Sequence, residues 1–152
     1  MSRTRPIALA LTAVAAAGVL GGCDRPTPLV TVSVSGNVVQ SEAQSYCQKA
    51  TTACPSRTTA IKTVSYKFGD SIGIDVPRSI AAGTWLVYAV GPAELQAQPQ
   101  PQLVLHGTHY ASLPSLTLPN DASELIIGSQ PFKPSSSNKG DGVWRFTLRQ
   151  AP

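Results

Sequence analysis

The sequence predicts an all-β fold, a single antiparallel β-sandwich over residues 29–152, preceded by a lipoprotein signal peptide. Three observations predict it. About eight short runs of alternating apolar and polar residues are separated by Gly, Pro and Asn turn signals. After the first 22 residues, the sequence lacks the apolar periodicity of an amphipathic helix. The first 23 residues have the parts of an export signal.

Residues 1–22 are predicted to be that signal. Arg3 and Arg5 supply a basic start, and residues 7–19 are almost wholly Ala, Leu, Val and Ile. This apolar stretch of about 13 residues is shorter than the roughly 20 that a membrane-spanning helix needs. Because Thr4 separates the two arginines, a twin-arginine signal is excluded.

The signal ends in Leu20-Gly21-Gly22-Cys23, which resembles the bacterial lipobox. The resemblance implies that Cys23 takes a diacylglyceryl group, with acyl chains such as palmitate, and becomes the mature N-terminus. Two or more acyl chains hold a protein at a bilayer essentially permanently. We therefore expect a lipoprotein at the extracytoplasmic face of the cell membrane, with the bilayer as its partner through Cys23. The alternative is an ordinary secretory signal with a chance cysteine.

Residues 24–28 are a short linker, which Pro26 and Pro28 stiffen toward an extended conformation of about 15 Å. Strands then follow. Val30, Val32 and Val34 alternate with polar residues, and Gly36-Asn37 signals a turn. Residues 41–48 form either a single helical turn or a loop.

The next strands are predicted on both sides of a Gly69-Asp70 turn. Residues 58–68 are rich in β-branched and aromatic side chains, with Val64, Tyr66 and Phe68 on one face. Residues 71–76 place Ile72, Ile74 and Val76 inward, and Pro77 ends that strand because it has no N–H to donate.

The C-terminal half continues the pattern. Residues 85–90 are apolar on both faces, which is typical of a central strand. Low-complexity residues 96–102 and polar residues 135–142 are predicted loops. The remaining strands are expected at residues 103–106, 115–118 and 123–128, and in a last strand that places Trp144, Phe146 and Leu148 on one face.

The length and charge of the chain limit the number of domains and the kinds of partner that we expect. The mature part has about 130 residues, which suits one domain. The net charge of the whole chain is +4, and it falls to +2 in the mature part without Arg3 and Arg5, so we expect no nucleic-acid partner.

Two cysteines remain once Cys23 is lipidated. Cys47 and Cys54 are predicted to form a structural disulfide, since this compartment is oxidising. Free thiols or a catalytic pair are the alternatives. Their spacing is too short for the inter-sheet disulfide of an antibody domain, which favours an immunoglobulin-like sandwich over a true immunoglobulin domain.

Together, the lipobox, the Cys47–Cys54 loop, the Gly69-Asp70-x-Ile-x-Ile-x-Val-Pro77 segment and the Trp85 strand resemble one family. Its members are small predicted lipoproteins of actinobacteria, grouped as a family of unknown function. The resemblance covers most of the mature chain. It implies a class and a compartment, and it brings no catalytic or ligand residues.

No catalytic, metal or cofactor site is predicted. His106 and His109 are three apart, so on a strand they point to opposite faces and a metal site would need a turn at Gly107. Exposed histidines are the alternative. Trp85 and Trp144 are predicted core residues rather than ligand platforms, because apolar neighbours share their faces. Asp121 and Glu124 are expected to cap or to be solvated.

These observations lead us to expect a non-enzymatic interaction or structural module of the cell envelope, whose partner is an envelope protein or a wall component. An alternative is a small-molecule or lipid-binding accessory protein with a pocket formed by Trp85, Tyr88 or Tyr110. A third is an enzyme or a protease inhibitor that presents loop 96–102 or 135–142.

Overall fold

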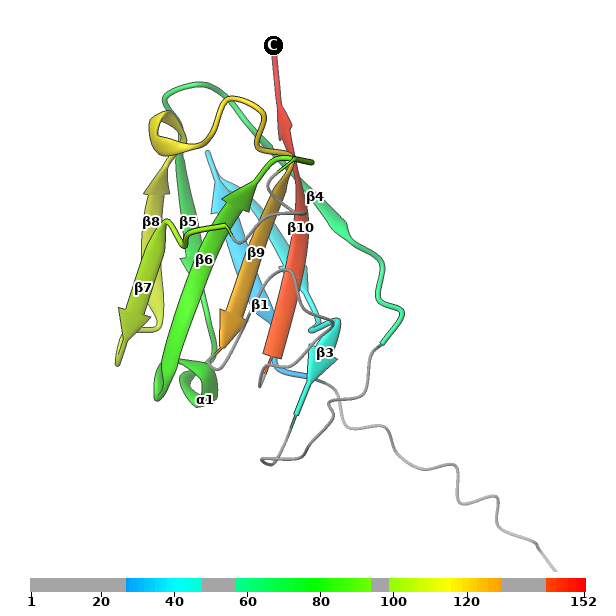
Figure 1. Ribbon diagram of the computed structural model, residues 1–152, viewed down its shortest axis with the longest axis vertical. Helices are drawn as coiled ribbons and strands as arrows, with labels where there is room; N and C mark the ends of the chain where they lie inside the picture. Colours follow the sequence, from blue (N-terminus) through cyan, green and yellow to red (C-terminus); the bar gives the residue numbers. More distant parts are fainter. Residues whose placement is uncertain (1–26, 48–56, 94–98, 130–141) are drawn as a thin grey trace, which may run out of the picture.

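The computed structural model describes residues 27–47, 57–93, 99–129 and 142–152. These residues form two β-sheets with almost no helix, so the all-β prediction is confirmed (Figure 1). The elements in chain order are β1 Val30–Val34, β2 Asn37–Ser41, β3 Ser45–Tyr46, β4 Lys62–Tyr66, β5 Ser71–Asp75, α1 Arg78–Ala81, β6 Thr84–Val90, β7 Leu103–His106, β8 Tyr110–Pro114, η2 Ser115–Thr117, β9 Glu124–Ser129 and β10 Gly142–Gln150.

One sheet has four strands in the order β2-β1-β5-β8, and every pairing in it is antiparallel. β1 and β2 form a hairpin closed by the pair Val34 and Asn37. Its two turn residues, Ser35 and Gly36, have φ values of 47° and 83°. Positive φ at both positions defines a type I′ turn, whose twist matches that of the strands. The turn is therefore one residue earlier than the predicted Gly36-Asn37.

The other sheet has six strands. Its main order is β3-β10-β9-β6-β7. The sixth strand, β4, also pairs with β10, further along that strand than β3 does. β3 covers Gly142 and Val143 at the start of β10, whereas β4 covers Phe146–Gln150 at its end. The β4–β10 pairing is parallel, unlike the antiparallel pairing predicted throughout. The reason lies at Gly69, where the chain passes from β4 to the other sheet instead of returning as a hairpin.

The hydrophobic core lies between the two sheets, which face each other in Figure 1. Apolar side chains at alternate positions along each strand fill this core. Val30, Val32 and Val34 are at most 2% exposed, and Ile72 and Ile74 are fully buried. Trp144 and Phe146 come from the opposite sheet into the same cluster. The predicted inward faces of β1, β5 and β10 are therefore confirmed.

β6 is buried on both faces, as its unbroken apolar sequence predicts. It lies between β9 and β7. Trp85, Val87 and Ala89 point into the main core. The alternate residues of β6 point to the outer face of the sheet. There Leu86, Tyr88 and Val90 form a second buried cluster with Ile126 of β9 and Val143 of β10.

Local predictions fail where the chain leaves a strand. Phe68 is 75% exposed rather than on the inner face, because it lies in the turn after β4. Residues 115–118 were predicted as a strand, but residues 115–117 form the 3-10 turn η2, and the strand β8 lies just before them. Residues 45 and 46 form the short strand β3, within a range predicted to be a helical turn or a loop.

Some predictions fall outside the described residues. These are the signal peptide and Cys23, the partner cysteine Cys54, and most of the two long loops. Cys47 is described and buried at the end of β3, with 9% exposure. The Cys47–Cys54 disulfide stays a prediction.

Candidate functional site

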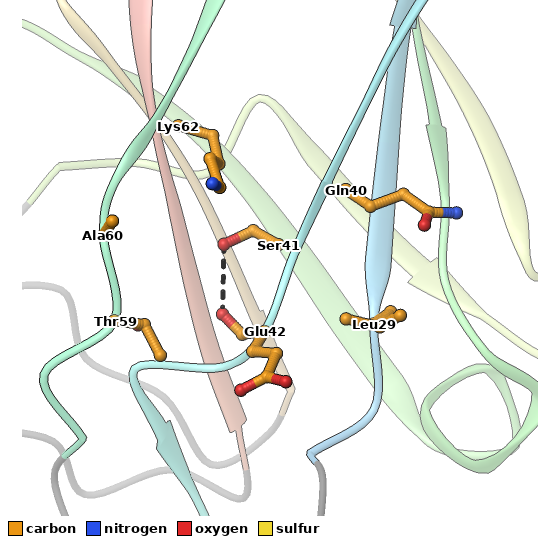
Figure 2. A pocket seen from close by; sticks show the side chains of 7 residues that line it. All are labelled: Leu29, Gln40, Ser41, Glu42, Thr59, Ala60 and Lys62. Carbon is orange, nitrogen blue, oxygen red and sulfur yellow. Dashed lines mark hydrogen bonds between the residues drawn. The ribbon is translucent and has the colours of Figure 1, made fainter.

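A shallow pocket of about 280 Å³ opens where the edges of the two sheets meet (Figure 2). One side comes from the end of β2 and the other from the chain entering β4. The residue before β1 completes the lining, which consists of Leu29, Gln40, Ser41, Glu42, Thr59, Ala60 and Lys62. β2 and β4 are each paired along one edge only in the described part of the chain, so the pocket is flanked by two open strand edges.

The pocket has a mixed polar and apolar lining and carries one charge of each sign. In Figure 2 the ammonium of Lys62 reaches down between the strands, and the carboxylate of Glu42 lies at the lower end of the pocket. The Ser41 hydroxyl already donates a hydrogen bond to the neighbouring carbonyl of Glu42 at 3.1 Å. The Thr59 hydroxyl is buried and has no hydrogen-bond partner. A buried hydroxyl without a partner costs about 1–3 kcal/mol.

The pocket lies beside the point where the chain enters the fold. Thr27 is 5% exposed, and its hydroxyl accepts a hydrogen bond from the Ala43 backbone N–H at 3.0 Å. The Pro28 carbonyl accepts one from the Trp144 indole at 2.9 Å. Both residues belong to the predicted linker, but these contacts make them part of the domain. The next residue, Leu29, already lines the pocket.

Both predicted core tryptophans are fully buried. Each indole N–H is satisfied by a backbone carbonyl: Trp144 binds Pro28, and Trp85 binds Thr108 at 2.7 Å. Tyr46 packs against Trp144 with ring centroids 6.3 Å apart. The tryptophans therefore pack the core and hold two loops rather than presenting ligand platforms.

The tyrosines named for a ligand pocket lie apart. Tyr88 is 4% exposed and points to the outer face of its sheet, opposite to Trp85, and burial raises the pKa of its phenol. Tyr110 lies on the other sheet and is half-exposed. The structure does not bring these three aromatic residues together.

The two histidines are exposed and have different partners. His106 Nδ1 lies 3.1 Å from the Thr84 hydroxyl, and His109 Nδ1 lies 3.4 Å from the Asp75 carboxylate. Gly107 between them does have a positive φ, as a turn requires. Among the described residues, no group of three His, Cys, Asp or Glu side chains is placed to hold a metal ion.

Two acidic residues were expected to cap or to be solvated. Glu124 instead begins β9, and its carboxylate lies 3.6 Å from the Arg145 guanidinium in a partly buried ion pair. Asp121 is exposed in the turn before β9, and its side chain covers Gly91 so closely that a Cβ there would clash.

The pocket residues carry no sequence signal. Glu42 and Lys62 are 20 positions apart and follow no motif, so only the meeting of the two sheet edges brings them together. In the sequence, Leu29 and Ala60 cannot be distinguished from ordinary residues that flank strands.

No family model, curated protein or solved structure matches this chain. Within the described residues, no helix is long and apolar enough to cross a membrane.

Proposed function

We propose that this chain is a lipid-anchored, non-enzymatic interaction module at the extracytoplasmic face of the cell membrane. Its signal sequence and the lipobox at Cys23 support the anchor. Likeness to the small actinobacterial lipoproteins is part of the same proposal. The pocket supports binding, because one cation and one anion in its lining suit recognition of a polar partner.

An immunoglobulin-like sandwich is the proposed architecture. In such folds the last two strands and the central strand lie in one sheet in the order G-F-C, and strands A, B and E lie in the other. The orders β10-β9-β6 and β1-β5-β8 fit this arrangement. Trp85, buried at the start of β6, fits the buried tryptophan of strand C.

The proposed partner is an extended, membrane-proximal segment of an envelope protein. The observation that carries this proposal is the pair of open edges at β2 and β4 on either side of the pocket. Open edges offer backbone N–H and C=O groups that an extended peptide can pair with. Lys62 and Glu42 would meet charges of opposite sign on that peptide.

The position of the pocket limits where the partner can be. Only residues 24–26 separate Cys23 from the first fixed residue, Thr27. Four extended peptide units reach about 13 Å. The pocket would therefore work close to the bilayer surface.

Site-specific photo-crosslinking in native membranes tests the proposal. A photo-reactive residue at Ala60, in the pocket, is expected to capture a defined envelope protein. The same residue at Val104, 63% exposed on β7, is the control and is expected not to capture it. Lys62→Glu should abolish the Ala60 product without lowering the melting temperature. Identical products from both positions, or none from Ala60, would refute the pocket as the binding site.

Lipid is a second candidate ligand for the same pocket. A cation and an anion beside the bilayer also complement a zwitterionic headgroup. In that case the Ala60 product would be a lipid adduct of small added mass rather than a protein conjugate.

A further inference from the structure

The outer face of the four-stranded sheet carries mostly small and uncharged side chains. Strand register places its outward side chains in rows across the sheet. One row runs Gln40, Thr31, Asp75 and Tyr110, and the next runs Val38, Ser33, Gly73 and Ser112. With strands about 4.8 Å apart, this face is about 14 Å wide.

A single aromatic ring lies across the middle of this face. A Cβ built on Gly73 would be 3.3 Å from Tyr110 Cε2 and 2.9 Å from its hydroxyl oxygen. It would also be 2.6 Å from Ser33 Oγ. The Tyr110 ring therefore rests on the Gly73 backbone, with its hydroxyl toward Ser33. Tyr110 is nevertheless 52% exposed, which leaves the other side of the ring open to solvent.

The fold holds Tyr110 in this position. The Thr108 hydroxyl donates to the Tyr110 carbonyl at 3.1 Å, and the Thr108 carbonyl accepts the buried Trp85 indole N–H. The Val76 N–H donates to the His109 carbonyl at 2.8 Å. The turn before β8 is thus tied to the core, which fixes the backbone from which the Tyr110 ring extends.

The groups around the ring are neutral hydrogen-bonding groups. They include the hydroxyls of Thr31, Ser33 and Ser112 and the amide of Gln40. Gln40 donates to Thr31 at 3.2 Å. Asp75 is the only charged residue among the outward side chains of these four strands, and His109 accompanies it at 3.4 Å. The outward side chains of these four strands include no lysine or arginine that would attract phosphate, nucleic acid or an acidic peptide.

We propose that this face binds a neutral polysaccharide chain of the cell envelope, with Tyr110 as the stacking platform. A sugar ring presents C–H groups on one face and hydroxyls around its rim. A flat aromatic ring matches the C–H face, and the surrounding hydroxyls and amide match the rim. The inference rests on the proposed function, because only an extracytoplasmic domain meets this polysaccharide. It concerns the outer face of the four-stranded sheet, which shares Gln40 with the pocket.

The test is native affinity electrophoresis of the mature protein, solubilised in a polyoxyethylene detergent that carries no sugar. Gels would contain β-1,3-glucan, arabinogalactan, galactomannan or dextran. At least one polysaccharide is expected to retard the wild-type protein. Tyr110→Ala should weaken that retardation at least about tenfold, and Tyr110→Phe, which keeps the ring, by less than about threefold.

Two further variants keep the test decisive. Ser112→Lys places a long side chain beside the ring at an exposed position, and it should reduce binding even if Tyr110→Ala unfolds the protein. Val104→Ala, on the other sheet, should bind like the wild type. If none of the four polysaccharides retards the protein, or if Ser112→Lys and a folded Tyr110→Ala bind normally, the inference is wrong. Those outcomes would leave the anchor and the pocket untouched.

Discussion

Asp70 stabilises the turn that carries the chain from one sheet to the other. Its carboxylate accepts hydrogen bonds from the Lys67 backbone N–H at 2.7 Å and from the Ser35 hydroxyl at 2.9 Å. These two bonds, with the charge of Lys67, lower the pKa of Asp70 from its ordinary value. One carboxylate therefore joins the β4–β5 turn to the β1–β2 hairpin.

The sign of its pH effect follows from the lowered pKa. Asp70 contributes stability above its unfolded pKa of about 3.9, and this contribution is lost as pH falls through the lower folded pKa. Asp70→Asn should therefore lower the melting temperature at pH 7 and reduce its fall between pH 5 and pH 2. Thermal unfolding across this range checks the prediction, and parallel curves for the two proteins would contradict it.

Trp144 connects the core to the start of the domain. Its indole N–H is the donor to Pro28, just after the proposed tether. Trp144→Phe should lower the free energy of unfolding by about 1–3 kcal/mol, because it removes the hydrogen bond and some buried volume.

Trp85→Phe is the matched control, since its indole binds Thr108 in a different loop. Hydrogen exchange distinguishes the two variants. Faster exchange at the amides of residues 29–31 is expected only in Trp144→Phe. Equal exchange there in both variants would show that Trp144 does not hold the N-terminal segment.

Among the elements, β7 shows how a strand can begin directly after a proline-containing segment. Pro101 has no N–H with which to continue the pairing of β7 along β6. The side-chain amide of Gln102 substitutes for a backbone partner. It accepts from the Ala89 N–H at 2.6 Å and donates to the Ala89 carbonyl at 3.2 Å.

Gln102→Ala should therefore lower the free energy of unfolding by about 1–3 kcal/mol, because it leaves buried backbone groups of Ala89 without partners. Gln40→Ala also removes a side-chain amide, but one on an exposed face, and should change stability by less than about 0.5 kcal/mol. Urea denaturation measures both. Similar losses in the two variants would remove the special role of Gln102.

Strand prediction succeeded where burial alone decides the pattern. β1 alternates strictly, the apolar residues of β5 and of the second half of β10 recur at every other position, and β6 is apolar on both faces, so each was evident in the sequence. The parallel pairing of β4 with β10 was not, because it depends on contacts between residues about 85 positions apart. Phe68 was misplaced because an apolar residue after a strand has the same pattern whether the strand continues or turns.

The candidate sites were less predictable than the strands. The pocket joins residues from two sheet edges, and its lining follows no motif. Tyr110 was recognised as an aromatic residue, but its position on Gly73 requires the β5–β8 register. Both surfaces depend on pairings that a single sequence does not specify.

At the scale of the whole molecule, the proposed anchor determines which partners the pocket and the sheet face could meet. The pocket adjoins the residues that follow Cys23 in the sequence. The outer face that carries Tyr110 belongs to the same four-stranded sheet as the first strand. A module held this close to the bilayer would meet membrane partners at the pocket and wall polymers at the sheet face. The central claim is therefore the lipidation of Cys23.

Intact mass spectrometry of the protein isolated from membranes tests that claim most directly. We expect a mature chain that begins at Cys23 and carries the mass of a diacylglyceryl group, and a Cys23→Ser variant that keeps its signal and lacks this mass. A mature chain that begins elsewhere, or an unmodified Cys23 thiol, would contradict it.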